Sequence, residues 1–218
     1  MIRNVIFDLD GTLVNTIADI AASMNRALSL RNLPLPPPGA YPAMVGWGLR
    51  RLAQQALPAD RQDDALVDQV CADAVAFYAQ EPSLRSKPYP GIPELLGELH
   101  RRGMVQAVLT NKPDSVAALV VDAIFPGHAF VLIRGDRPGL PRKPDPALTR
   151  EVMDAMGAAA ASTLFVGDSS VDVETGHCVG CPVVGVSWGF RGRKELEDAG
   201  ADYIVDDARE ILSILGRL

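Results

Sequence analysis

The feature that most constrains the fold is an alternation of short apolar runs with amphipathic helical patterns. Most of the runs are continuously apolar, as is typical of parallel strands covered on both faces. The alternation therefore predicts an α/β fold with a doubly wound parallel sheet. The candidate strands are residues 3–8, 105–110, 129–133, 162–167, 183–187 and 203–205.

Two segments between these runs carry the spacing of an amphipathic helix. Pro93 near the start of the first segment and Gly103 at its end are typical helix boundary residues. The apolar stripes consist of Ile92, Leu95, Leu96 and Leu99 in the first segment, and of Val116, Leu119, Val120, Ala123 and Ile124 in the second.

Between residues 14 and 86 the alternation stops, and only helical patterns are present. We therefore expect a small helical cap, residues 14–86, inserted into a core made of residues 1–13 and 87–218. The chain would return at "SKPYPG", residues 86–91, whose prolines and glycine suit a hinge. The helical patterns are a stripe of Ile17, Ile20, Ala21, Met24, Ala27 and Leu28, a segment through Leu49, Leu52, Ala53 and Ala56, and a segment at roughly 62–80.

Composition excludes several classes of protein. Of the 218 residues 48% are hydrophobic, which suffices for a full core, and the formal net charge of −6 argues against a nucleic-acid partner. No apolar run reaches the length of a membrane span, and the N-terminus runs directly into a strand pattern, so no signal peptide is expected. Three cysteines make no disulfide framework. We expect a cytoplasmic monomer or homodimer without membrane partners.

Polar side chains gather where the predicted strands end. Asp8 and Asp10 close the first strand in "VIFDLDGTL", and burying unpaired carboxylates is costly. Sites in α/β sheets form at the carboxyl ends of the strands, so the residues there should meet. The other candidates are Thr110, Asn111 and Lys112 after the second strand, Asp168 after the 162–167 strand with Asp172 one turn on, and Lys143 in "RKPDP".

This set of side chains suits a metal ion and a phosphate group. Several carboxylates without histidine or thiol partners favour a hard cation, and Mg²⁺ takes few protein oxygens besides water and substrate phosphate. A lysine and a threonine hydroxyl can hold the remaining phosphoryl oxygens. The turn at Gly11 can add backbone N–H groups, because glycine allows close approach. A bound cation would neutralise the two aspartates.

The same motifs resemble those of the haloacid dehalogenase superfamily of phosphotransferases. "DLDGTLV" (8–14) is similar to its first motif, "TNK" (110–112) to its second, Lys143 to its third and "GDSSVD" (167–172) to its fourth. The four occur in order along the whole chain. The resemblance implies a Rossmann-like core with an inserted helical cap. "YPGIPELLGELHRRG", "TNKP" and "VGWGLRRL" are similar to the phosphoglycolate phosphatase-like branch.

The resemblance also implies a role for each matching residue. Asp8 would be the nucleophile that forms an aspartyl-phosphate. Asp10 would be general acid and then general base. The ligands of Mg²⁺ would be Asp8, the Asp10 backbone carbonyl and Asp168, with Asp172 supporting the water shell. The phosphoryl group would be held by Thr110, Asn111 and Lys143, which fits a reaction governed by positioning and charge neutralisation.

Some positions depart from the family pattern or lie outside it. Asn15 stands where many relatives carry aspartate, at a position outside the chemistry. The segment 125–141, rich in Gly, Pro and Arg, does not align with the family. Asp145 is expected to be a helix N-cap.

Rival functions find less support. "GVSWG" (185–189) matches the serine-hydrolase elbow, but all three histidines precede Ser187, which reverses the order that fold requires. "CVGC" (178–181) lacks further zinc ligands and is expected to close a helix, with both cysteines buried. A dehalogenase would not need Asp10. A sugar-phosphate mutase, or a phosphatase for another small ester, remains an alternative, and a purely binding module would gain nothing from the complete set.

Specificity should come from the cap, because the core motifs supply contacts only for phosphate and metal. "VGWGLRR" (45–51) places glycines around Trp47, followed by Arg50 and Arg51, whose guanidinium groups could bind a carboxylate with both oxygens. We expect the cap to close over a small carboxylate-bearing phosphate ester such as 2-phosphoglycolate, with hinges near Val14 and Pro88.

Overall fold

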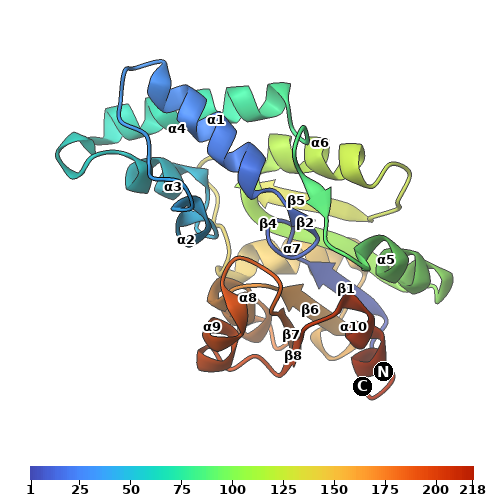
Figure 1. Cartoon of the computed structure of the whole chain (residues 1–218). Coiled ribbons are helices and arrows are strands. Elements are labelled where there is room, and N and C mark those ends of the chain that lie inside the picture. The colour runs from blue at the N-terminus through green and yellow to red at the C-terminus, as the bar shows by residue number, and fades with distance from the viewer.

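The computed structural model describes residues 1–218 and confirms the parallel α/β sheet (Figure 1). The six strands lie in the order β5-β4-β1-β6-β7-β8, and every neighbouring pair is parallel. The first strand in the sequence thus lies inside the sheet, and its end is surrounded by the ends of other strands. The strands are β1 (Asn4–Phe7), β4 (Val105–Pro113), β5 (Leu132–Asp136), β6 (Thr163–Gly167), β7 (Val183–Val186) and β8 (Tyr203–Val205).

Side chains of the inner strands alternate between two apolar clusters, one on each face of the sheet. Val5 and Phe7 belong to the larger cluster and Ile6 to the smaller; Phe165 of β6 joins the smaller and Val166 the larger. The larger cluster includes α5 (Ile92–Arg101), α6 (Asp114–Ile124) and α10 (Ala208–Leu215), and the smaller includes α7 (Pro146–Met156), α8 (Ser170–Cys178) and α9 (Gly192–Asp198). Continuous apolar runs therefore correspond to strands buried on both faces.

Two sequence-based details were wrong. The strand expected at 129–133 begins at Leu132 and ends at Asp136. It is an edge strand with mostly half-buried side chains, so its sequence does not need a continuous apolar run. In α6 the buried face includes Ala117 and Val121, whereas Leu119 is 41% exposed. Because α6 is apolar on nearly every side, its periodicity could not identify the buried face.

Residues 14–86 contain four α-helices, which lie together to one side of the sheet (Figure 1). They are α1 (Ile17–Ser29), α2 (Tyr41–Met44), α3 (Leu49–Ala56) and α4 (Asp64–Gln80). The predicted stripe of α1 packs inward through Ile20, Met24, Ala27 and Leu28. None of the chain's helices combines the length and the apolar character that a membrane span requires.

A short two-stranded ribbon lies where the chain enters and leaves this helical segment. Strand β2 (Val14–Asn15) pairs antiparallel with β3 (Lys87–Pro88), with Val14 opposite Pro88. The buried Asp19 carboxylate accepts hydrogen bonds from the backbone N–H groups of Arg85 and Ser86 at 2.9 and 2.8 Å, and from the Ser86 hydroxyl at 2.6 Å. The two crossings of the chain are therefore tied together.

Candidate active site

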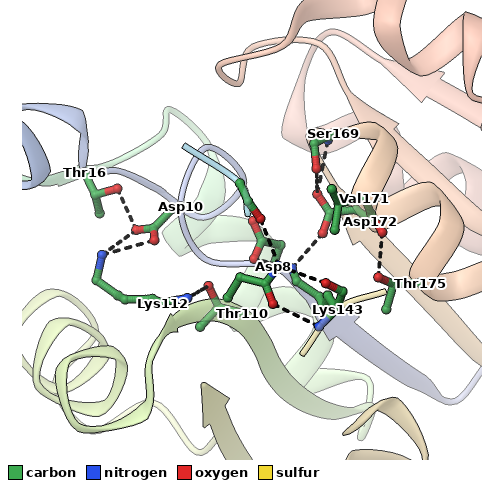
Figure 2. Close-up of polar contacts among 12 residues, drawn as sticks. Asp8, Asp10, Thr16, Thr110, Lys112, Lys143, Ser169, Val171, Asp172 and Thr175 are labelled. Atoms are coloured by element: carbon green, nitrogen blue, oxygen red, sulfur yellow. Dashed lines mark hydrogen bonds and ion pairs between the residues drawn. The ribbon is translucent and has the colours of Figure 1, made fainter. Parts of the chain in front are cut away.

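Asp8 lies at the end of β1, and its side chain is only 8% exposed. The Lys143 ammonium donates to Asp8 Oδ1 at 2.7 Å and to Asp172 Oδ1 at 2.7 Å (Figure 2). Lys143 comes from the loop before α7, where Asp145 is the helix N-cap as predicted and accepts from the Ala147 N–H at 2.9 Å. One buried lysine thus bridges two buried carboxylates.

Asp168 and Asp172 come from the end of β6 and the first turn of α8. The Ser169 N–H and hydroxyl donate to Asp172 Oδ2 at 3.1 and 2.6 Å, and the Phe190 N–H donates to Asp168 Oδ2 at 2.7 Å. One oxygen from each of Asp8, Asp168 and Asp172 lies within 4.8 Å of the others. Three buried carboxylates and no nitrogen or sulfur ligand form a donor set that fits a hard divalent cation.

The charges in this cluster do not balance. Burial raises the pKa of Asp8 to about 7, with the neighbouring Asp172 adding to the shift and Lys143 opposing it. Burial also raises the pKa of Asp168. Burial alone would lower the pKa of Lys143, but the Asp172 and Asp8 carboxylates outweigh it, and the pKa rises. Since one lysine faces three carboxylates, a bound cation would relieve the repulsion among them.

Two glycines make room for Asp168. Gly11 has a φ of +93°, and a Cβ atom there would lie 2.2 Å from Asp168 Oδ2. A Cβ atom at Gly189 would lie 2.2 Å from the Asp168 Cβ. Glycine at position 11 is therefore required by backbone conformation and by close approach. Its contribution to phosphate binding stays a prediction.

Thr110 and Asn111 both line the cavity beside Asp8 but differ in how their side chains are used. The Thr110 hydroxyl accepts from the Lys112 N–H at 3.2 Å. The Asn111 amide donates to the carbonyls of Gly46 and Lys143 at 2.9 and 3.1 Å, and its oxygen accepts from the Lys143 N–H at 2.9 Å. Asn111 thus orients the Lys143 loop, and its predicted contact with phosphate stays a prediction.

Asp10 has a lysine of its own. The Lys112 ammonium donates to Asp10 Oδ1 and Oδ2 at 2.8 and 3.1 Å, and the Thr16 hydroxyl donates to Asp10 Oδ1 at 2.6 Å (Figure 2). The Lys112 side chain is 2% exposed. Asp8 and Asp10, two residues apart, are therefore each paired with a different buried lysine.

Tyr78 of α4 completes the surroundings of Lys112. Its hydroxyl accepts from the Lys112 ammonium at 2.8 Å, and the residue is 1% exposed. From the sequence, Lys112 was named at the strand end without being given a role, and Tyr78 was not named. Tyr78 carries only a weak signal in the sequence, a hydroxyl on the buried stripe of a helix.

A cavity lies between the strand ends and the helical segment. Its floor contains Asp8, Asp10, Lys143, Asp168 and Asp172. The helical segment contributes apolar side chains and glycine backbone to the walls, with Tyr78 as its one polar side chain. The apolar contributors are Ile20, Val45, Leu49 and Leu52. The predicted catalytic, phosphate-binding and metal-binding side chains thus line one cavity.

Trp47, Arg50 and Arg51 line a separate, more open hollow. The Arg50 guanidinium donates to Asp64 and Asp68 at 2.6 Å each, within the helical segment. The Arg51 guanidinium lies 5.5 Å from the centre of the Trp47 ring. In this conformation none of the three lines the cavity, and their reading of the substrate stays a prediction.

Core side chains hold the loop that carries Trp47. Arg191 donates to the carbonyls of Ala43 and Val45, and Arg142 donates to the Trp47 carbonyl at 3.1 Å. With the Asn111 contact to Gly46, these bonds fasten residues 43–47 over the cavity. The loop is therefore held by side chains of the core here, and its mobility stays a prediction.

The rival motifs occupy structural positions. The Ser187 hydroxyl donates to Asp206, and the Trp188 indole N–H donates to the Thr12 carbonyl at 3.1 Å, so this turn packs beside the site. Cys178 ends α8 as predicted, and Cys181 is buried. Cys178, the last residue of α8, is exposed, contrary to expectation.

The chain was compared with known protein families, sequences and structures. The model of the haloacid dehalogenase-like hydrolases matches residues 5–186. Proteins named phosphoglycolate phosphatase from Rhodospirillum rubrum and Haemophilus influenzae are each 35% identical to this chain, over 99% and 96% of it and 92% and 96% of their own lengths. A crystal structure described as a predicted phosphoglycolate phosphatase from Haemophilus somnus superposes with a TM-score of 0.88 at 31% identity, covering 98% of both chains.

The chain therefore belongs to the haloacid dehalogenase-like hydrolase family. The family model reaches from β1 to the end of β7 and so includes all the strand ends that form the floor of the cavity. The resemblance drawn from the four motifs is confirmed, and so is the Rossmann-like core with its inserted helices.

Proposed function

We propose that this protein is a Mg²⁺-dependent phosphatase that hydrolyses a small phosphate monoester, with 2-phosphoglycolate as the leading substrate, through phosphorylated Asp8. The observation that carries the proposal is the pairing of Asp8 with Lys143 and of Asp10 with Lys112 at the end of one strand. Relatives named phosphoglycolate phosphatase, similar over nearly the whole chain, support the choice of substrate.

In the first half-reaction an Asp8 oxygen attacks phosphorus, and the bond from phosphorus to the ester oxygen breaks. Asp10 gives its proton to the departing oxygen, so that oxygen leaves as a neutral hydroxyl group. Lys143, beside Asp8, neutralises charge on the phosphoryl oxygens, and Thr110 has a hydroxyl proton to donate to them. The products are an alcohol and an aspartyl-phosphate.

In the second half-reaction Asp10, now a carboxylate, accepts a proton from water as the water attacks the same phosphorus. The bond between phosphorus and the Asp8 oxygen breaks, inorganic phosphate leaves, and Asp10 regains the proton it gave away. The Lys112 and Thr16 contacts hold Asp10 in one orientation for both transfers.

Asp8, Asp168 and the Asp10 backbone carbonyl are the residues that would hold Mg²⁺, with Asp172 behind them. When bound, the ion supplies positive charge that neutralises the phosphoryl oxygens and the clustered carboxylates. The Asp172 carboxylate is oriented by Ser169 and Lys143, which fits a supporting position.

We also propose that residues 14–86 act as a cap that moves on the ribbon of β2 and β3. The pairing of Val14 with Pro88 supports hinges at these positions. The bonds from Arg142 and Arg191 to residues 43–47 would hold the closed form and keep bulk water away from the aspartyl-phosphate. Location in the cytoplasm and the monomeric or dimeric state stay predictions.

The test is phosphate release from p-nitrophenyl phosphate and from a panel of small phosphate monoesters, with and without Mg²⁺. We expect release that needs Mg²⁺ and the highest kcat/KM for 2-phosphoglycolate. Return of the phosphoryl group to a sugar phosphate would favour the mutase alternative. Absence of turnover with every ester would contradict the proposal.

A further inference from the structure

The cavity has two cationic side chains. One lies beside the proposed nucleophile, and the other lies beside the proposed acid and base. Lys143 is bound to Asp8 and Asp172, on the side of the phosphoryl group. Lys112 is bound to Asp10, on the side where the leaving oxygen would take its proton. Any additional negative charge on the leaving alcohol therefore has only Lys112 among the cavity's cations near it.

Beside Lys112, the hydroxyl of Tyr78 has a proton that it donates to no other group of the protein. It accepts from Lys112 at 2.8 Å, and none of the chain's hydrogen bonds uses its own proton. The side chain is buried and lines the cavity, and it is the one polar side chain that residues 14–86 bring to the wall. A buried hydroxyl gains stability when its proton finds an acceptor, so a ligand oxygen would be favoured here.

The chemistry of the substrate class explains why this position matters. In the phosphate ester of a 2-hydroxy acid, a single carbon separates the leaving oxygen from the carboxylate. If the leaving oxygen faces Asp10, the carboxylate of the substrate must lie close to the carboxyl group of Asp10. Once Asp10 has given its proton to the leaving oxygen, two like charges lie at that distance and repel each other unless a cation lies between them.

We propose that Lys112 and Tyr78 bind the substrate's carboxylate and so determine specificity, an inference that rests on the proposed function. Lys112 contacts both oxygens of Asp10, at 2.8 and 3.1 Å. If Lys112 releases the longer contact, one of its N–H groups can donate to the substrate while another still donates to Asp10. The Tyr78 hydroxyl then donates its free proton to the same carboxylate, and the ammonium neutralises both anions.

The experiment compares two ligands that differ only at this group. Ethyl phosphate has a methyl group where 2-phosphoglycolate has its carboxylate, so the ratio of the two affinities isolates the carboxylate. Titration calorimetry with Mg²⁺ in an Asp8→Asn background, which cannot turn over, gives this ratio directly. We expect Lys112→Met to lower the preference for 2-phosphoglycolate by ~10-fold or more and Tyr78→Phe by a smaller factor, the scale of lost charge-assisted bonds.

Tyr41→Phe is the matched control, because Tyr41 also lies in the helical segment but binds Asn25 away from the cavity. It should leave the ratio unchanged. An unchanged ratio in Lys112→Met and Tyr78→Phe, or no preference for 2-phosphoglycolate in the parent, would overturn the inference. If Lys112→Met does not fold, the Tyr78→Phe ratio decides. Failure of the proposed function looks different, because the wild-type chain would then release phosphate from no ester.

Discussion

The surroundings of Asp8 and Asp10 differ in where their partners come from. Asp8 is surrounded by Lys143, Asp168 and Asp172, which all follow strands or loops of the sheet. Asp10 is bound by Lys112 from β4, and Lys112 in turn is bound by Tyr78 of α4. All the residues around Asp8, where the phosphoryl group would bind, thus come from the sheet and its loops. The surroundings of Asp10, where the leaving group would lie, also include a residue of the inserted helices. We infer that recognition of phosphate is independent of those helices and that recognition of the alcohol depends on them.

Replacing the nucleophile should have the largest effect. Asp8→Asn removes the attacking carboxylate, so kcat for every ester should fall by more than ~100-fold, since the covalent route is lost as a whole. The measurement is phosphate release with p-nitrophenyl phosphate and 2-phosphoglycolate, alongside the circular dichroism spectrum as a check of folding. Retention of more than about a hundredth of the wild-type kcat would show that Asp8 is not the nucleophile.

Removing the lysine of the phosphoryl side should cost stability as well as activity. Lys143→Met leaves Asp8 and Asp172 buried without their cation, and breaking a buried ion pair in this way costs about 3–5 kcal/mol. Urea unfolding measures the loss, and Mg²⁺ should restore part of it. Lys194→Met is the control, because the exposed Lys194–Asp198 pair contributes only about 0.5 kcal/mol. Equal effects of the two substitutions would contradict the buried cluster.

Stabilisation by Mg²⁺ should grow with pH. The folded protein without metal holds the proton of Asp8 more tightly than the unfolded chain, because burial raises this pKa to about 7. The stability that Asp8 contributes is therefore present below the unfolded pKa and is lost as pH rises through about 7. Mg²⁺ competes with that proton, so its shift of the melting temperature should be larger at about pH 8 than at about pH 5.5. Equal shifts at both values would argue against metal binding at Asp8.

The smallest effects should come from the arginines. From the sequence alone we expect that one of the variants Arg50→Ala and Arg51→Ala loses ~10-fold in kcat/KM for the carboxylated ester. The structure instead places Arg50 against Asp64 and Asp68, outside the cavity. We therefore expect less than about a twofold change for both esters, well below one hydrogen bond to a charged group. If either variant lost kcat/KM for 2-phosphoglycolate alone, the arginines and not Lys112 would be the residues that bind the substrate carboxylate.

The features that could be predicted from the sequence are those that depend on local residue patterns, such as strands and the carboxylates at their ends. All six strands of the main sheet were placed to within three residues at each end, since apolar runs and strand-end carboxylates are visible without tertiary contacts. Asp8, Asp168 and Asp172 were expected to meet because parallel strands end at one edge, and the structure brings them within 4.8 Å. Their chemical roles stay predictions.

What the sequence could not predict depends on orientation between distant elements. Asn111 carries a motif position, but its amide is used by the Gly46 and Lys143 carbonyls, which no local pattern reveals. The contact between Tyr78 and Lys112 joins residues far apart in sequence through the packing of α4 over the strand ends. Arg50 was expected to reach the substrate from the glycine-containing loop before its helix, and no local pattern shows that Asp64 and Asp68 of α4 bind its guanidinium in this conformation.

The division of labour between Asp8 and Asp10 is tested most directly by trapping the covalent intermediate in Asp10→Asn. Nitrophenolate needs little help from an acid to leave, so Asp8 should still become phosphorylated, whereas water attack would lack its base. Mg²⁺ binding should persist, because the proposed ligand at position 10 is a backbone carbonyl. After mixing with p-nitrophenyl phosphate and quenching in acid, peptide mass spectrometry should find one phosphoryl group on the peptide that contains Asp8, with a stoichiometric burst of nitrophenol. Absence of both the burst and the phosphopeptide, or a phosphoryl group on another residue, would contradict the two roles.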